Sequence, residues 1–325
     1  MDFLKNTLYI LIEGEPQSPE IDFLEKVIGN LKDSSQLPNV DHDLIAVGGS
    51  NAFNSIARLV YAQSNLHRKI PVLAITDRDF KREQDIQRKQ QTTDKYLVNN
   101  KVVRELCWPR HEWENYLLEE TEMLAEILNQ IPIRQSGQPS APSKKPKLFK
   151  RRNTILSKSQ LDNWLKEYFQ NKIKDELIEC LKFRFNTDKI CPQLENISND
   201  DILDIAAMKD WFLRPIEQNC QAEIRSQHIE EINSRFEDTL AELDWENWLN
   251  NPSLVDFDQA KRYFRGKEAF ENLFEKLNQE VDLVPGKTYR NFIKEIMLPE
   301  MEHQPDCLLI QELGTMLSPY FEIVA

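Results

Sequence analysis

The stretch Leu8-Tyr9-Ile10-Leu11-Ile12, followed directly by Glu13-Gly14, decides the fold of this chain. A continuous apolar run that stops at a polar residue and a glycine is typical of a strand buried on both faces of a parallel sheet. Similar runs follow at 44–47, 70–75 and, more weakly, 103–107, with helical spacing between them at 21–31 and 51–61. This alternation predicts an α/β domain, with a mostly parallel sheet flanked by helices, over residues 1–130.

The composition changes after residue 130. Residues 131–158 are rich in Pro, Ser and Lys and have no periodicity that could build a core, which predicts a flexible loop. Residues 159–325 place apolar side chains at helical spacing and predict a mainly helical domain, with helices at 161–183, 224–243, 257–277 and 307–320. We therefore expect two domains joined by a basic loop.

The charge of the chain is acidic as a whole and basic in one place. With 41 basic and 54 acidic residues the net charge is −13, which excludes a protein that coats nucleic acid by bulk attraction. Between Arg134 and Lys158, however, there are eight basic residues and no acidic one. The candidates for phosphate contacts in this loop are Lys144, Lys145, Lys147, Lys150, Arg151 and Arg152.

The sequence also predicts where the protein works. Its five cysteines are widely spread and form no C-x-x-C pair, as expected for a reduced protein. The first residues lack the basic region and cleavage site of a signal peptide, and no apolar stretch approaches the length of a membrane span. We expect a cytoplasmic protein without a membrane partner.

Acidic side chains follow two of the predicted strands. Glu13 ends the first strand, and Asp77 and Asp79 follow the third. The carboxyl ends of parallel strands meet at one edge of a sheet, and side chains two residues apart point the same way while the backbone stays extended. Converging carboxylates repel one another unless a cation lies between them, and hard oxygen ligands favour Mg²⁺, with Mn²⁺ as a substitute.

The order of these features resembles the TOPRIM domain of topoisomerases, primases and a group of nucleases. Strand-Glu-Gly, helix, strand-Gly-Gly, helix and strand-Asp-x-Asp follow one another here as in that family. The resemblance implies that Glu13 transfers a proton and contacts metal, and that Asp77 and Asp79 hold magnesium. The chain shows no cysteine-rich zinc module of the primase type, and the sequence gives no evidence of the strand-cutting tyrosine domain that a topoisomerase needs, so we expect neither a primase nor a topoisomerase.

Two further elements narrow the resemblance to nucleases. The stretch Arg110-His111-Glu112-Trp113-Glu114-Asn115-Tyr116-Leu117 is similar to an element of TOPRIM nucleases in anti-phage defence, which include the overcoming-lysogenization-defect nucleases and the PARIS effector. Phe264-Arg265-Gly266-Lys267 is similar to the Gly-Lys element of the same group, which implies that Lys267 offsets developing phosphate charge. Gly286-Lys287 is a weaker candidate for that element.

The chain departs from the nuclease pattern in one place. Gln17 stands where the family has an acid four residues after the first Glu. An insertion in this loop would make Glu20 the second metal ligand, with Asp22 as the alternative, and Glu114 could supply the missing carboxylate. Without any of these, two-metal chemistry is in doubt.

The resemblance implies a function. It implies a magnesium-dependent nuclease, with tRNA favoured over DNA as substrate, that acts as a homodimer and is restrained by an ABC-type ATPase. The chain lacks a Walker motif, so that ATPase would be a separate polypeptide. The alternative, which Gln17 favours, is a non-catalytic interaction protein with a degenerate TOPRIM fold.

Other notable residues are expected to be structural. A single His111 near a strand end is more often a hydrogen-bonded structural group than a base. Ser50 and Asn51 are expected to cap a helix. The tryptophans that lie within helical patterns are expected to pack in cores, and these are Trp164, Trp211, Trp245 and Trp248.

Overall fold

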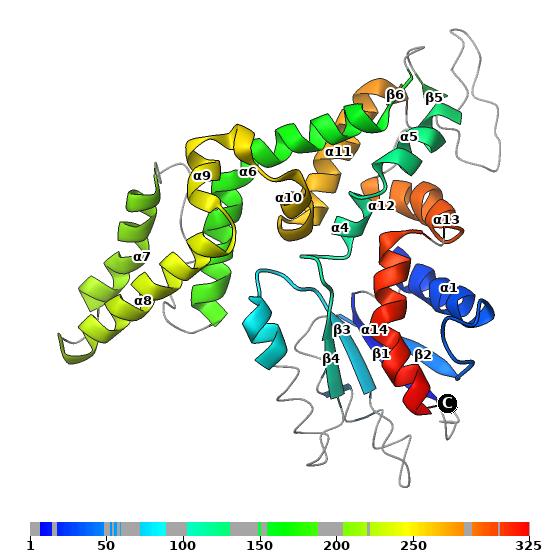
Figure 1. Cartoon of the computed structure of the whole chain (residues 1–325), viewed down its shortest axis with the longest axis horizontal. Coiled ribbons are helices and arrows are strands. Elements are labelled where there is room, and N and C mark those ends of the chain that lie inside the picture. Colours follow the sequence, from blue (N-terminus) through cyan, green and yellow to red (C-terminus); the bar gives the residue numbers. More distant parts are fainter. Residues whose placement is uncertain are drawn as a thin grey trace. The chain divides into compact units, whose positions relative to one another are not determined.

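The structure is a computed structural model (Figure 1) and describes residues 7–14, 18–48, 53, 55–56, 59, 72–88, 103–130, 149–150, 155–187, 204–219, 222–282, 288–304 and 306–324. It forms two compact units. The sheet unit comprises Met1–Asp162 and Gly266–Ala325, and the helical unit comprises Asn163–Arg265. The predicted division at residue 159 differs from this one, because the chain after Gly266 returns to the unit that holds the sheet.

All four strands of the sheet are parallel and lie in the order β2-β1-β3-β4. The strands are β1 (Leu8–Glu13), β2 (His42–Val47), β3 (Val72–Thr76) and β4 (Val103–Cys107). The predicted α/β class, with a parallel sheet flanked by helices, is confirmed. Because β1 and β3 are interior strands whose side chains are buried on both faces, their sequences are continuous apolar runs without alternation.

The C-terminal helix explains why the last sixty residues belong to the sheet unit. In α14 (Leu308–Val324), Tyr320 lies 4.8 Å below the Arg104 guanidinium of β4, and the Phe321 ring is 6.0 Å from that of His42 in β2. Figure 1 shows α14 (red) lying against the strands beside α1 (Pro19–Asp33). The sequence pattern predicted this helix correctly but not its place against the sheet.

Short elements surround the carboxyl edge of the sheet. They are α4 (Glu114–Leu117), α5 (Thr121–Gln130), α11 (Gly266–Glu280), α12 (Tyr289–Phe292), the π-helix η5 (Ile293–Met297) and α13 (Leu298–Met301). A two-stranded antiparallel ribbon pairs β5 (Phe149–Lys150) with β6 (Val281–Asp282). Of the predicted basic loop, residues 131–148 and 151–154 lie outside the described residues. Within the part of the chain that is described, no helix is long and apolar enough to cross a membrane.

The helical unit is built on aromatic packing. It contains most of α6 (Lys158–Thr187), with α7 (Ile205–Asn219), α8 (Ala222–Glu242), α9 (Trp245–Asn250), η4 (Pro252–Leu254) and α10 (Phe257–Tyr263). The rings of Trp245 and Phe264 stack 5.5 Å apart, and Trp248 is buried beside them, so both tryptophans are core residues as predicted.

One predicted helix is broken in two. The pattern at 257–277 predicted a continuous helix, but α10 ends at Tyr263 and α11 begins at Gly266. The backbone of Phe264 is extended, which turns its ring onto Trp245. Packing of one aromatic ring has therefore overridden the helical periodicity, and the break sets Lys267 in the first turn of a new helix.

Candidate active site

The structure brings four acidic side chains together at the carboxyl edge of the sheet. Glu13 ends β1 and Asp77 follows β3, the strand that pairs with β1 in parallel register. Glu20 lies in the first turn of α1 and is only 6% exposed, and Glu114 is the first residue of α4. The residues come from four separate segments, which are joined here by the sheet topology.

The pKa values of three of these carboxyls are raised by burial and by neighbouring acids. Burial is the largest cause for Glu20, whose pKa lies well above its ordinary value, and the charges of Asp77, Glu114 and Glu13 raise it further. Burial is also the largest cause of the raised pKa of Asp77. The negative charges of four neighbours raise it further, and these are Glu114, Glu112, Asp79 and Glu13.

The Glu114 carboxyl has a pKa of about 7. Burial and the charge of Glu112 raise this pKa, whereas Lys267 and Arg290 lower it through their positive charges. A group of buried carboxyls that raise each other's pKa values lacks compensating positive charge at its centre.

Asp79 does not lie in the extended arrangement expected for the Asp-x-Asp pair. The strand ends at Thr76, and Asp79 has a φ of +49°, in the left-handed region that aspartate tolerates better than most residues. Its amide donates a hydrogen bond to the carbonyl of His111 (2.9 Å). The turn sends its carboxylate to the ammonium of Lys81 (2.8 Å), so the expectation that both aspartates face one site through an extended backbone is wrong.

The Gly-Lys element is joined directly to the segment before α4. The carboxylate of Glu112 accepts a hydrogen bond from the backbone N–H of Lys267 (2.9 Å), which satisfies one of the free donors at the start of α11. A Cβ added to Gly266 would lie 2.6 Å from the backbone nitrogen of Asn115, so only glycine allows this approach. The side chain of Asn115 in turn accepts from the Glu112 amide (2.8 Å). These contacts explain how two sequence elements 150 residues apart form one wall.

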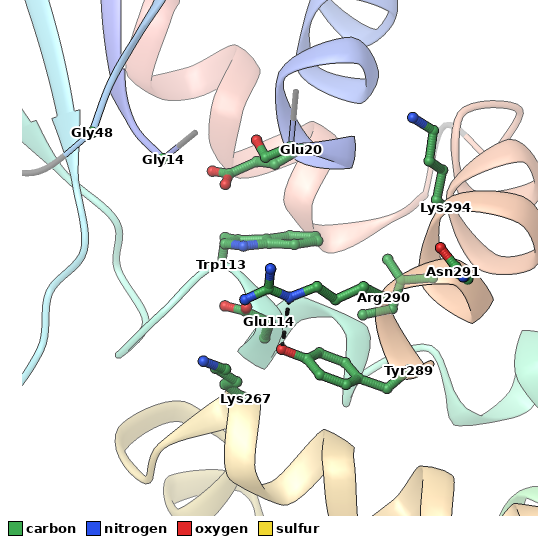
Figure 2. Close-up of a pocket in the computed structure, with 12 residues that line it drawn as sticks. Gly14, Glu20, Gly48, Trp113, Glu114, Lys267, Tyr289, Arg290, Asn291 and Lys294 are labelled. Atoms are coloured by element: carbon green, nitrogen blue, oxygen red, sulfur yellow. Dashed lines mark hydrogen bonds between the residues drawn. The ribbon is translucent and has the colours of Figure 1, made fainter. Parts of the chain in front are cut away.

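A cavity of about 430 Å³ opens in front of two of the acids. Figure 2 shows Glu20 on one side of it, with Trp113, Glu114 and Lys267 on the other. Its remaining lining comes from the loop ends after β1 and β2 and from the helices after residue 288, and these residues are Gly14, Ser18, Gly48, Tyr289, Arg290, Asn291, Ile293 and Lys294.

Sequence reasoning missed the basic side chains of this cavity. Arg290 extends from α12 toward Glu114 (Figure 2), and its Nε donates to the Tyr289 hydroxyl (3.2 Å). Lys294, four residues later in η5, lines the same cavity. The spacing of the two cations by four residues, one helical turn, was a usable signal. The apolar pattern of residues 277–307 predicts no helix, however, so the spacing of these two cations carried no prediction.

The other candidates lie elsewhere or are occupied. Asp22 is exposed on α1 and lies 3.8 Å from Lys294, so Glu20 and not Asp22 joins the acids. His111 is buried, with its ring 4.4 Å from that of Phe80. Of the basic-loop candidates, Lys150 lies in β5. The others lie outside the described residues, and these are Lys144, Lys145, Lys147, Arg151 and Arg152. Gln17, Gly286 and Lys287 also lie outside the described residues.

The acids have the oxygen ligands that a hard divalent cation prefers, but they lie too far apart to hold one. Glu13, Glu20, Asp77 and Glu114 offer only carboxylate oxygens, the ligands that Mg²⁺ prefers. Among the described residues, however, no group of three or more acidic, histidine or cysteine side chains is close enough to hold one ion. A cation here would therefore have to draw the carboxylates inward, and its positive charge would offset the repulsion that raises the pKa values of Glu20 and Asp77.

Comparisons with known proteins do not extend this description. No family model, no curated protein and no solved structure matches the chain.

Proposed function

We propose that the chain is a magnesium-dependent nuclease with a TOPRIM-type domain, which cuts phosphodiester bonds in RNA, with tRNA favoured, or in DNA. The observation that carries the proposal is the meeting of buried acids with cations. Glu20, Asp77 and Glu114 interact through their charges, and the positive charges of Lys267 and Arg290, which line the same cavity, lower the pKa of Glu114. A scissile phosphate needs both kinds of group, since its metal binds carboxylates and its oxygens bind cations.

Each residue has a role in this proposal. Glu20, Asp77 and Glu114 would hold magnesium, which supplies stabilisation for charge on the attacking and leaving oxygens when bound. Glu13, at the end of β1, would accept or donate the proton of the attacking water. Lys267 would offset negative charge on the phosphate, because its ammonium is a compact point charge at the mouth of the cavity.

The partners follow from the resemblance rather than from the cavity. We propose that the nuclease acts in anti-phage defence in the cytoplasm, as a homodimer restrained by a separate ABC-type ATPase of the PARIS kind. An ATPase gene beside this one would support that part of the proposal.

The test of the nuclease proposal compares the same substitution at two aspartates, one in the site and one outside it. Asp77→Asn should abolish cleavage of tRNA or DNA in magnesium, because it removes a buried ligand, and should lower magnesium affinity measured by calorimetry. Asp22→Asn is the matched control, since Asp22 is exposed on the same edge and lies against Lys294. Equal cleavage by both variants would reject the site.

The second candidate is a non-catalytic interaction protein with a degenerate TOPRIM fold. The observation that favours it is the spacing of the acids, because among the described residues no three acidic, histidine or cysteine groups could hold one ion. Metal titration separates the two. A structural site should bind calcium as well as magnesium without any cleavage, whereas calcium should inhibit the nuclease.

A further inference from the structure

Trp113 lies in the wall of the cavity, directly before Glu114 in the sequence. It stands between Glu112, which caps α11, and Glu114, which begins α4. Its side chain is half-buried and lines the cavity, whereas Trp245 and Trp248 are buried in the core of the helical unit. No other aromatic ring packs on its indole among the residues that the structure describes. An indole in such a position is free to receive a planar ligand.

The groups around Trp113 are those that a nucleotide requires. Figure 2 shows the indole lying between the carboxylate of Glu20 and the guanidinium of Arg290. The Tyr289 hydroxyl accepts a hydrogen bond from Arg290 Nε (3.2 Å), and the Arg290 side chain lines the cavity (Figure 2). Lys267 and Lys294 add two further cations to the lining. The cavity thus combines one flat apolar face with three phosphate-binding side chains.

The size of the cavity limits what can enter. About 430 Å³ falls within the range of pockets that hold one small ligand, and it is too small for a stack of base pairs. In a duplex the faces of each base are covered by its neighbours. Only an unpaired or extruded base can place its face on an aromatic side chain.

We propose that this cavity binds a single unpaired nucleotide of the substrate, with its base stacked on Trp113 and its phosphates held by Arg290 and Lys267. The inference rests on the proposed nuclease function and specifies its substrate. The site selects single-stranded regions, such as RNA loops, over paired ones. Trp113 is a specificity residue in this arrangement, and Tyr289 is a positioning residue that acts through Arg290.

Binding without cleavage tests the inference separately from the enzyme activity. The probes are fluorescently labelled oligonucleotides, one unpaired RNA, one RNA hairpin of the same composition and one unpaired DNA, measured by anisotropy with the Asp77→Asn protein. We expect the unpaired RNA to bind at least about tenfold more tightly than the hairpin, since stacking one base contributes roughly that factor or more. Adding Trp113→Ala should remove about tenfold of that affinity, and Trp113→Phe should retain most of it.

Control variants keep the result interpretable. Trp211→Ala removes a tryptophan of the helical unit, whose ring packs on Phe212 at 5.0 Å, and should leave binding unchanged. Tyr289→Phe keeps the ring but removes the hydroxyl that holds Arg290, so it should weaken the binding of unpaired RNA and of unpaired DNA by the same factor. A lower affinity of the parent protein for unpaired DNA than for unpaired RNA would show that the site also recognises the sugar.

The outcomes for the two proposals differ. Equal affinity for hairpin and unpaired RNA, or a Trp113→Ala protein that folds and binds like its parent, would overturn the inference even if the wild-type protein cleaves RNA. Binding that depends on Trp113, in a protein whose wild type cleaves no nucleic acid in magnesium, would support the nucleotide subsite and reject the nuclease.

Discussion

At the scale of single residues, Glu114 connects the site to pH. Its pKa of about 7 means that the carboxyl is neutral in the folded protein at pH values where it would be ionised in the unfolded chain. Glu20 and Asp77 shift in the same direction, because burial and mutual repulsion disfavour their charged forms. A raised pKa contributes stability below the unfolded value, and this contribution is lost as pH rises through the folded value.

We therefore predict that the metal-free protein loses stability between about pH 4.5 and pH 7, by up to about 1.4 kcal/mol per pH unit for each titrating carboxyl. Glu114→Gln should flatten this slope and raise stability at pH 8, because the amide keeps the shape of the side chain without its charge. Urea unfolding in the presence of a chelator measures both effects. Identical slopes for variant and wild type would contradict the predicted burial of charge.

Lys81 occupies the position next to the aspartates that a cation could take. Its ammonium donates to the Asp77 carbonyl (2.5 Å) and to the Asp79 carboxylate (2.8 Å). The side chain of Asp79 is 40% exposed, so this ion pair alone stabilises the protein only slightly. Its larger effect is to place a positive charge beside Asp77 and Asp79.

We predict that Lys81→Met tightens magnesium binding by about threefold to tenfold, because it removes a positive charge beside Asp77 and Asp79 that repels the ion. Calorimetric titration gives the affinity directly. Arg82→Met is the matched control, since the adjacent Arg82 pairs with Asp85 (2.7 Å). Weaker binding in Lys81→Met would mean that the lysine positions Asp79 for the ion.

At the scale of elements, the start of α11 against α4 is the most constrained junction. A Cβ on Gly266 would meet the side-chain oxygen of Asn115 at 2.4 Å and its backbone nitrogen at 2.6 Å. Backbone cannot move aside as a flexible side chain can, so the two elements would have to separate. Lys267 and Glu114 would separate with them, since each begins one of these helices.

Gly266→Ala should therefore destabilise the protein by about 1–3 kcal/mol and reduce cleavage. Gly29→Ala, in the same unit, should change the stability in the opposite direction. A Cβ on Gly29 in α1 would meet nothing within 4 Å, so alanine there should stabilise by about 0.5–1 kcal/mol. Thermal unfolding of both variants distinguishes a steric cause from a general effect of adding a methyl group.

The elements also show what could be predicted from sequence. The four strands and the helices α1, α6, α8 and α14 followed from apolar periodicity, because buried parallel strands and amphipathic helices impose it on their residues. The Asp77–Asp79 turn and the break at Phe264 did not follow, since each depends on a contact made by a distant segment, the His111 carbonyl in one case and the Trp245 ring in the other. Lys294 lies in the short π-helix η5, which standard helical spacing does not describe.

At the scale of the whole molecule, the proposed ion site lies entirely in the sheet unit. Local binding protects the backbone that it orders and leaves independent units unchanged. We predict that magnesium slows amide hydrogen exchange in β1, the first turn of α1 and α4, and leaves exchange in α7 and α8 of the helical unit as it was. Exchange measured by mass spectrometry tests this, and equal protection of both units would place the ion elsewhere.

The lining of the cavity has a consequence for synthesis of the chain. Its residues extend from Gly14 to Lys294, so the final cation joins the cavity only when nine-tenths of the polypeptide has left the ribosome. Contacts between such remote segments close late in folding, because long loops must first be ordered. A cavity assembled in this way would stay incomplete on the translating ribosome until η5 had emerged.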